Sequence, residues 1–312
     1  MAYFYFVFCV LIWSTSFLLM KKAVLVYEPL GVAAWRVLLG GSVVMGLWCL
    51  RSRRRTLAGR HLLPIACVAV LGYAWPFSIQ PVLVGRVGSS VLGMGVGLVP
   101  LMTVVVSLPL LRVFHNRRQL IGIFGALLSL GVLMLDRLRF DVPLRDLAMV
   151  LTVPLAYACA NVVVRRWLRE IPALELTAAS LIGATLCLSP SLPKISERQE
   201  VQDQAGQDGG VRSSQITRVE ATMCVAALGL LGTGMAQVFF TQLIQDRGPL
   251  FASMANNLVP VGAVVLGWWD AEHVTFAQVI ALIGVISMVA LVQFEPRWLR
   301  RAPAKNGKNE ER

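Results

Sequence analysis

Long stretches of this chain carry almost no polar side chains, and this feature limits the folds open to it. Residues 91–111 stay apolar over the length that an α-helix needs to cross a bilayer. A spanning segment must satisfy its backbone N–H and C=O groups without water, so it forms a helix or part of a closed barrel. Barrel strands alternate polar and apolar residues over about ten positions, and this stretch does not. The sequence therefore predicts an all-α integral membrane protein.

Apolar runs of this kind recur along the chain, separated by charged or turn-rich breaks. The first run does not have the pattern of a signal peptide, because no basic segment precedes it and no small-residue cleavage site follows it. The sequence predicts ten transmembrane helices, near residues 3–20, 30–50, 62–84, 89–111, 119–136, 146–164, 173–190, 219–244, 249–269 and 275–294.

The basic residues between the spans predict the orientation of the chain. With ten spans, one side of the membrane receives 18 lysines and arginines and the other side ten, four of them in the long loop 191–218. Cytoplasmic loops carry the excess of basic residues, and charges in long loops count less. We therefore expect a multi-pass protein with both termini in the cytoplasm. The net charge of +12 follows from this pattern and does not indicate a nucleic-acid site, which would gather basic residues on one soluble face.

The two halves of the chain resemble each other. The segment from Gly88 to Pro100 falls on the segment from Gly248 to Pro260 at a shift of 160 residues, and both end in Leu-Val-Pro. At a shift of 144, Trp13 meets Tyr157. The predicted domains are a five-helix repeat over 1–140, a second over 141–295 that contains a disordered extracytoplasmic loop at 191–218, and a basic cytoplasmic tail at 296–312.

An odd number of spans in each repeat forces the second copy to enter the membrane in the opposite sense. Inverted repeats are frequent in secondary transporters, whose substrate site lies near the midplane between the repeats. Two equivalent halves can exchange conformations, which gives outward-open and inward-open states of similar energy. We therefore expect transport by alternating access, with gene duplication without transport as the alternative.

In these features the chain resembles the drug/metabolite transporter superfamily, EamA type, over about 1–295 apart from the long loop. The residues that carry the resemblance are Trp13-Ser-Thr-Ser-Phe17 followed by Lys21, Pro29 with Arg36, the paired Gly88 to Pro100 and Gly248 to Pro260 segments, and Glu272 after the ninth span. The resemblance implies a permease or exporter of amino acids or related metabolites in a bacterial inner membrane. One departure is that Arg112 occupies the position equivalent to Glu272 in the alignment of the halves. A pair of acids, one in each half, that could couple protons is therefore reduced to one.

Arg36 is the clearest ionisable residue inside a predicted span. A charge there costs at least about 2.5–3.5 kcal/mol on insertion scales and is a functional candidate for that reason. Arg36 could bind a substrate carboxylate or pair with Glu28, or its side chain could extend to the membrane interface.

Asn256 and Asn257 break the repeat symmetry, because Val96 and Gly97 occupy the equivalent positions within Gly93-x-Gly95-x-Gly97. Buried amides need hydrogen-bond partners and glycines let backbones approach, so this pattern predicts either a midplane binding site or helix packing. Aromatic and amide side chains elsewhere in the spans would suit a zwitterionic or aromatic solute, although some could be interfacial belt residues. These further substrate-binding candidates are Trp13, Tyr73, Trp75, Gln80, Tyr157 and Gln237. Prolines that free helix carbonyls are hinge candidates, namely Pro76, Pro100 and Pro260.

The competing classes are an intramembrane enzyme and a channel. An enzyme would need a nucleophile with its base, a metal set or paired acids, but the three histidines fall in predicted loops and the six cysteines lack metal-binding spacing. A channel would not require inverted repeats. We expect a transporter of a small metabolite, with efflux as the direction, with no cofactor or metal, and with a proton as a conceivable coupling ion.

Overall fold

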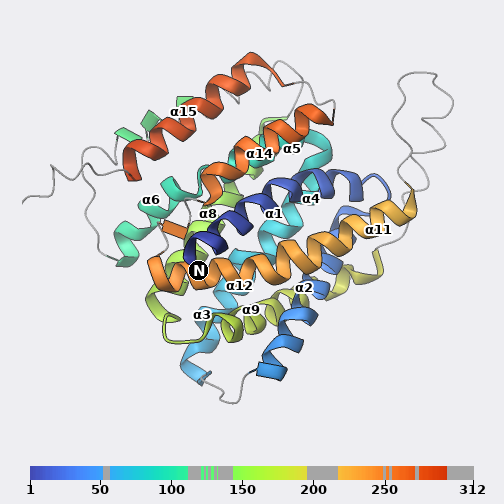
Figure 1. The fold of residues 1–312 in the computed structure, drawn as a ribbon, viewed down its shortest axis with the longest axis vertical. Helices are drawn as coiled ribbons and strands as arrows, with labels where there is room; N and C mark the ends of the chain where they lie inside the picture. The colour runs from blue at the N-terminus through green and yellow to red at the C-terminus, as the bar shows by residue number, and fades with distance from the viewer. Residues whose placement is uncertain are drawn as a thin grey trace, which may run out of the picture.

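The computed structural model describes residues 1–51, 57–111, 143–194, 217–248, 251–252, 255–270 and 274–293, together with separate positions between 121 and 132. The regular elements in these ranges are helices, which confirms the all-α prediction (Figure 1). Their bounds are α1 Ala2–Ala23, α2 Pro29–Arg51, η1 Gly59–His61, α3 Leu62–Val68, η2 Ala69–Ala74, α4 Trp75–Val87, α5 Ser89–Val96, α6 Val99–Leu111, α8 Leu144–Trp167, α9 Ala173–Leu188, η3 Ser189–Lys194, α11 Arg218–Ala227, η4 Leu228–Met235, α12 Ala236–Arg247, α14 Ala255–Trp269 and α15 Phe276–Gln293.

Within the described residues, seven helical segments are long and apolar enough to cross a membrane. They are Ala2–Ala23, Pro29–Arg51, Gly59–Val87, Ser89–Ser107, Leu144–Trp167, Ala173–Leu192 and Arg218–Arg247, and shorter apolar helices cover Leu258–Trp269 and Phe276–Met288. Every predicted span except 119–136 therefore falls on an apolar helix. Most of 119–136, most of the loop 191–218, and the tail 296–312 lie outside the described residues.

Two of the long segments widen into π-helices, which the sequence pattern did not predict. In η2 and η4, the N–H that caps each wide turn bonds to the carbonyl five residues earlier. Pro76 follows η2, and a wider turn relieves the clash between its ring and the carbonyl four residues back. In η4, the Thr233 hydroxyl also donates to the Leu228 carbonyl at 3.0 Å.

The π-helices and the glycines that follow them occupy matching places in the two halves. Gly88 ends α4 with φ 87° and ψ 157°, and Gly248 ends α12 with φ 91° and ψ 163°. Positive φ values of this kind favour glycine because it has no Cβ. The two residues are 160 positions apart, which is the shift at which the sequence halves align.

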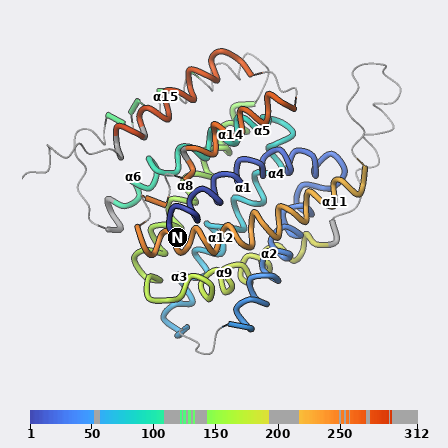
Figure 2. The backbone as a smooth tube through the Cα atoms, in the orientation of Figure 1, coloured from blue at the N-terminus to red at the C-terminus, as the bar shows by residue number. Residues whose placement is uncertain are grey.

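Helices from the two halves pack against each other throughout the core. The N-terminal helix α1 lies between α12 and α14 (Figures 1 and 2). The contacts are reciprocal: α2 packs on η4 as α9 packs on η2, and α1 packs on α14 as α8 packs on α6. Helix α15 lies at the edge of the bundle, beside α14 and α6.

Large apolar side chains cover much of the outer surface, as a hydrocarbon environment allows. Phe4, Leu186 and Ile283 are all mainly exposed although they lie within helices. Trp268 and Trp269 are exposed at the end of α14, where amphipathic aromatic rings suit the membrane interface.

The contact between α2 and η4 is close because glycines stand on both sides of it. A Cβ on Gly40 would lie 2.8 Å from the Gly229 carbonyl oxygen and 2.8 Å from the Thr233 Cβ. A Cβ on Gly229 would lie 2.7 Å from the Leu39 Cβ. These helices can approach this closely only while both positions lack side chains.

This packing predicts that Gly40→Ala destabilises the protein by about 1–3 kcal/mol, because the added methyl overpacks the contact. The measurement is the melting temperature of the purified protein in detergent. Gly46→Ala is the matched control, since Gly46 lies in the same helix with nothing within 4 Å of the added Cβ. Equal melting temperatures for the two variants would contradict the prediction.

Candidate functional site

A cavity lies in the core between the two halves of the chain. It offers about 70 Å³ to the centres of water-sized molecules, which is room for about five waters. Its lining is mainly apolar and comes from both halves: Trp13, Ser16, Phe17, Met20, Arg36, Val68, Gly72, Tyr73, Phe77, Gln80, Val96, Tyr157, Ala160, Asn161, Val164, Leu176, Gln237, Phe240, Thr241, Ile244, Asn256 and Val259.

Arg36 turns its guanidinium into this cavity and does not extend it to the membrane interface. The side chain is only 4% exposed. Its Nε donates to the Thr233 hydroxyl at 2.8 Å, and its Cζ lies 4.1 Å above the centre of the Phe77 ring. Among the described residues Arg36 forms no ion pair, and Glu28 is not its counter-ion. A positive charge in the core is thus held by one hydroxyl and one aromatic face.

Aromatic and polar side chains hold one another in place around the guanidinium. Gln80 Nε2 donates to the Tyr157 hydroxyl at 3.4 Å. This bond crosses between the halves, since Gln80 belongs to the first and Tyr157 to the second. Tyr73 and Thr241 also line the cavity, and the Thr177 hydroxyl donates to the Thr241 hydroxyl at 3.1 Å.

Trp13 closes one wall of the cavity. Its Nε1 donates to the Gly232 carbonyl at 3.1 Å, and its ring meets Phe240 edge to face at 4.8 Å. Gly232 belongs to η4, the wide turn that also carries the Arg36 partner. The indole is therefore fixed by the same element that holds the guanidinium.

Asn161 is a cavity residue that was absent from the sequence-based candidates. It lies one helical turn after Tyr157 on the same face of α8, is 6% exposed, and its Nδ2 has no hydrogen-bond partner among the described residues. A buried amide donor without a partner is costly and is a natural position for a ligand acceptor. The sequence did hold a signal, because Asn161 falls opposite Phe17 at the shift of 144 and so breaks the repeat symmetry.

The structure brings most of the predicted substrate-binding residues together and leaves Trp75 apart. Trp13, Arg36, Tyr73, Gln80, Tyr157, Gln237 and Asn256 line the cavity. Trp75 does not, because its half-exposed ring lies outside the cavity, where Nε1 bonds to the Thr152 hydroxyl at 3.1 Å. Asn257 belongs to α14, but its side chain lies outside the described part of the structure.

The predicted hinge prolines lie at irregular points of their helices. Pro76 follows η2, Pro100 is the second residue of α6 after the break between α5 and α6, and Pro260 lies inside α14. Gly97 stands at that break, and a Cβ there would lie 2.8 Å from the Pro260 ring. The hinge role of these prolines stays a prediction.

Gly93, Gly95 and Gly97 serve helix packing and do not form a cavity wall. A Cβ on Gly93 would collide with Ala263, and a Cβ on Gly95 would lie 2.6 Å from Val150. Of this glycine segment, only Val96 lines the cavity. The packing alternative therefore accounts for the glycines, because they let α5 approach α14 and α8.

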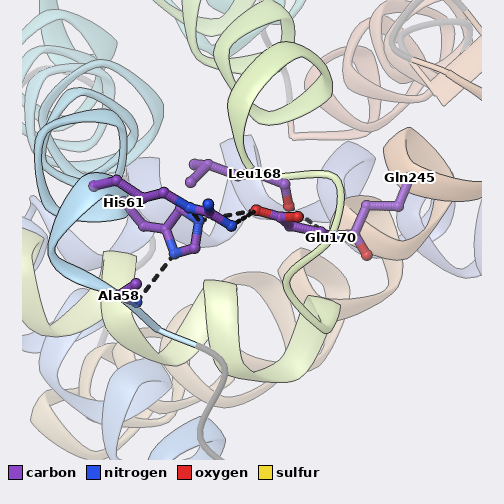
Figure 3. Close-up of polar contacts among 6 residues, drawn as sticks. Ala58, His61, Leu168, Glu170 and Gln245 are labelled. Carbon is purple, nitrogen blue, oxygen red and sulfur yellow. Dashed lines mark hydrogen bonds and ion pairs between the residues drawn. The ribbon is translucent and has the colours of Figure 1, made fainter.

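Beyond one end of the cavity, a polar cluster joins the start of α3 to the loop between α8 and α9 (Figure 3). The His61 Nδ1 accepts from the Ala58 N–H at 3.1 Å, so the neutral ring carries its proton on Nε2 and donates to Glu170 Oε1 at 3.0 Å. Arg60 Nη2 also donates to Glu170 Oε1 at 2.7 Å. Arg60 Nε lies 3.0 Å from the same His61 Nε2 but cannot donate to it while that atom carries the proton. We call this cluster of Arg60, His61 and Glu170 the Glu170 clasp.

The neighbouring end of α12 is tied to the same loop. Gln245 Nε2 donates to the Ile171 carbonyl at 2.6 Å, and Arg165 Nη1 donates to the Gln245 carbonyl at 3.0 Å (Figure 3 shows Gln245 beside this loop). The His61 and Arg60 contacts lower the pKa of the Glu170 carboxyl. A lowered carboxyl pKa means that the clasp is complete at neutral pH and is lost as the pH falls through that value.

The opposite end carries two further ion pairs between the halves. Lys21 Nζ lies 2.7 Å from Asp270 Oδ2 and so joins the ends of α1 and α14. Arg86 Nη1 lies 3.3 Å from Asp146 Oδ1 and so joins the end of α4 to the start of α8. Each ion pair described here and in the Glu170 clasp joins residues before 141 to residues after it, and the cavity lies between the two sets.

Metal chemistry has no support in the part of the chain that the structure describes. Groups of three or more His, Cys, Asp and Glu residues that could hold a metal ion do not occur there.

Thr233 is predicted to be a key support of the site, because its hydroxyl accepts from Arg36 and donates to Leu228. Thr233→Val keeps the shape but leaves the Arg36 Nε without its acceptor, at a cost of about 1–3 kcal/mol. We expect a lower melting temperature for Thr233→Val and a near-normal one for Thr233→Ser, which keeps the hydroxyl. A stable Thr233→Val protein would show that Arg36 does not depend on this bond.

Comparisons with known proteins give one family and one fold. The model of the EamA-like transporter family matches residues 1–135 and again residues 145–294. A solved structure, described only as the crystal structure of a protein, shares the fold with a TM-score of 0.65 and 15% identity, covering 94% of this chain and 96% of that chain. No curated protein matches the chain in sequence.

Proposed function

Because this chain belongs to the EamA-like transporter family, we propose that it moves a small carboxyl-bearing metabolite, an amino acid or a related acid, across a membrane by alternating access. The observation that carries the proposal is the central cavity, which holds a buried arginine without a counter-ion among the described residues and lies between ion pairs that join the two halves. Multiple apolar helices support a multi-pass membrane protein, and we place it in a bacterial inner membrane.

We propose that the halves are inverted five-span repeats over 1–140 and 141–295, ten spans in all. Three features support this arrangement: the reciprocal packing of helices, the paired π-helices η2 and η4, and the matching positive φ values of Gly88 and Gly248. A two-fold relation of this kind gives the transporter two conformations of similar energy, each open on a different side.

The ion pairs also support the predicted alternation of the spans. Each pair joins residues that the ten-span topology puts on the same side of the membrane, Lys21 with Asp270 and Arg60 with Glu170, for example. With the excess of basic residues assigned to the cytoplasm, the Glu170 clasp closes the cytoplasmic side and both termini are cytoplasmic. Efflux and a coupling proton belong to the same proposal, and Glu272, the acid implied by the family resemblance, lies outside the described residues.

Transport by the purified protein tests the proposal. In proteoliposomes, counterflow of labelled amino acids and related acids should reveal at least one transported solute. Arg36→Ala should abolish its counterflow at normal protein abundance, because a desolvated charge that binds the substrate is lost. Arg166→Ala is the matched control, since Arg166 lies outside the cavity over the Trp167 ring and should transport normally.

If no solute moves with folded protein while a lipid or peptide is chemically altered, the chain is an enzyme and the proposal is wrong. If a solute moves at the same rate in Arg36→Ala and in the control, Arg36 is not part of the site.

Alternating access predicts that each set of ion pairs holds one side closed. Glu170→Gln removes the charge of the Glu170 clasp and should increase the labelling of a cysteine at Ile244, a cavity residue next to Gln245. Asp270→Asn removes the opposite pair and should increase the labelling of a cysteine at Met20 instead. The measurement is the rate of reaction with a membrane-impermeant maleimide, applied from each side, in a background without the six native cysteines.

The two charge variants serve as controls for each other. Removing one set of ion pairs should raise cysteine labelling severalfold at its own end of the cavity and lower it at the other end, because the two states share one population. A rise at both ends together would indicate general loosening and would contradict alternating access.

A further inference from the structure

The cavity carries a net positive charge in the described part of the structure. Arg36 is the one charged side chain among its lining residues. Glu175, the acid nearest in sequence to a lining residue, is buried in the first turn of α9 and does not line the cavity. An arginine in a low-dielectric core stays protonated and is costly unless a counter-charge pairs with it.

Several polar groups of the cavity also have donors to offer a ligand. A guanidinium has five N–H donors, and Arg36 uses its Nε on Thr233. The Asn161 Nδ2 is buried without a partner among the described residues. The Tyr157 oxygen accepts from Gln80, which leaves its own O–H to donate. A ligand that satisfies these groups must bring acceptor oxygens.

We infer that the solute bound in this cavity is a monoanion, a small carboxylate with an apolar or aromatic body, and is neither a zwitterion nor a cation. This inference rests on the proposed transport function and narrows its substrate class to the related acids, so that free amino acids are excluded. The carboxylate pairs with Arg36 and makes the loaded cavity neutral. Arginine suits this role because its planar fork binds a carboxylate through two parallel hydrogen bonds.

An ammonium group on the solute would have no carboxylate to meet among the described lining residues. The aromatic faces of Trp13 and Phe240 can attract a cation. The Phe77 face is already occupied by the guanidinium of Arg36. A free amino acid would have to desolvate its ammonium with weak compensation. The same aromatic rings offer good contact to an apolar body.

Asn161 has a separate role as a donor to the bound acid. It lies on the same face of α8 as Tyr157, and both residues line the cavity with Arg36. Its unpartnered amide would gain an acceptor only when the anion is bound. Asn161 is therefore a specificity-determining residue, and its loss should weaken binding without removing the charge pairing.

Three labelled solutes that share a phenyl ring and a two-carbon chain test the charge preference. They are 3-phenylpropionate, an anion; phenylalanine, a zwitterion; and 2-phenylethylamine, a cation. In counterflow with the full chain in proteoliposomes, we expect 3-phenylpropionate to exchange at least about tenfold faster than phenylalanine, because an uncompensated ammonium is costly to desolvate. We expect no exchange of 2-phenylethylamine.

The outcomes separate this inference from the transport proposal. Faster exchange of phenylalanine or 2-phenylethylamine overturns the monoanion inference and leaves transport standing. If none of the three moves, a wider panel of small solutes decides: movement of a monoanion supports the inference, and movement of only zwitterions or cations overturns it. If nothing in the panel moves, the transport proposal itself fails.

Binding of the anion by variants tests the two donors separately. In a thermal-shift titration with the anion that exchanges, Arg36→Gln should weaken affinity at least about 30-fold, because one partner of a buried charge pair is removed. Asn161→Leu should weaken it roughly 3- to 10-fold, the effect of one neutral hydrogen bond. Ser180→Ala is the matched control, since the Ser180 hydroxyl is also buried without a described partner but lies outside the cavity.

Equal affinities in Asn161→Leu and Ser180→Ala would remove Asn161 from the site. Retained affinity in Arg36→Gln, with a normal melting temperature as proof of folding, would overturn the inference as a whole. A shift of Arg36→Gln toward phenylalanine over 3-phenylpropionate would support it, because the excess positive charge is then gone.

Discussion

The close approach of α2 to the wide turn η4 sets the geometry on which the site depends. Gly40 and Gly229 let the two backbones touch, and this contact brings Thr233 to the guanidinium of Arg36. The same Thr233 hydroxyl donates to the Leu228 carbonyl within the wide turn. One side chain thus links the wide turn to a buried charge. A bilayer core offers no water to take its place.

The same contact has a counterpart between α9 and η2, so the scaffold is nearly two-fold while its ends are held by different chemistry. At one end, Lys21 and Arg86 pair with acids of the second half. At the other, a buried histidine and an exposed arginine share Glu170. Partly exposed pairs are individually weak, which suits contacts that the proposed alternating access would break and form in every cycle. A rigid apolar seal at both ends would favour a single state.

The sequence predicted the scaffold well and the site partly, for physical reasons that differ. Apolar length determines where a helix can cross a bilayer, so the described helices lie where the sequence predicted spans. Arg36 was predictable as a site residue because a charge within an apolar span is costly and is therefore a functional candidate. Residue type alone did not separate Trp75 from Tyr73 as a site residue, because both are aromatic and lie two positions apart. The π-helix and the orientation of the helix decide that the Tyr73 ring points into the cavity and the Trp75 ring points outward. The role of Gly95 was open for a similar reason, since a missing side chain serves packing and ligand access equally well.

Several of the side chains that line the cavity break the two-fold pattern. At a shift of 160, Phe77 falls on Gln237 and Gln80 falls on Phe240, so an aromatic and an amide exchange places across the cavity. At a shift of 144, Phe17 falls on Asn161. Arg36 lies seven residues after Pro29, at the start of the second helix of the first half. The residue seven positions after Pro172, at the start of the second helix of the second half, is Ala179. A symmetric scaffold can interconvert two states at little cost, but a symmetric pair of arginines would repel in one small cavity. Under the proposed alternating access, one arginine together with one added amide donor in the cavity therefore permits the exchange of states and gives a bound solute a single orientation.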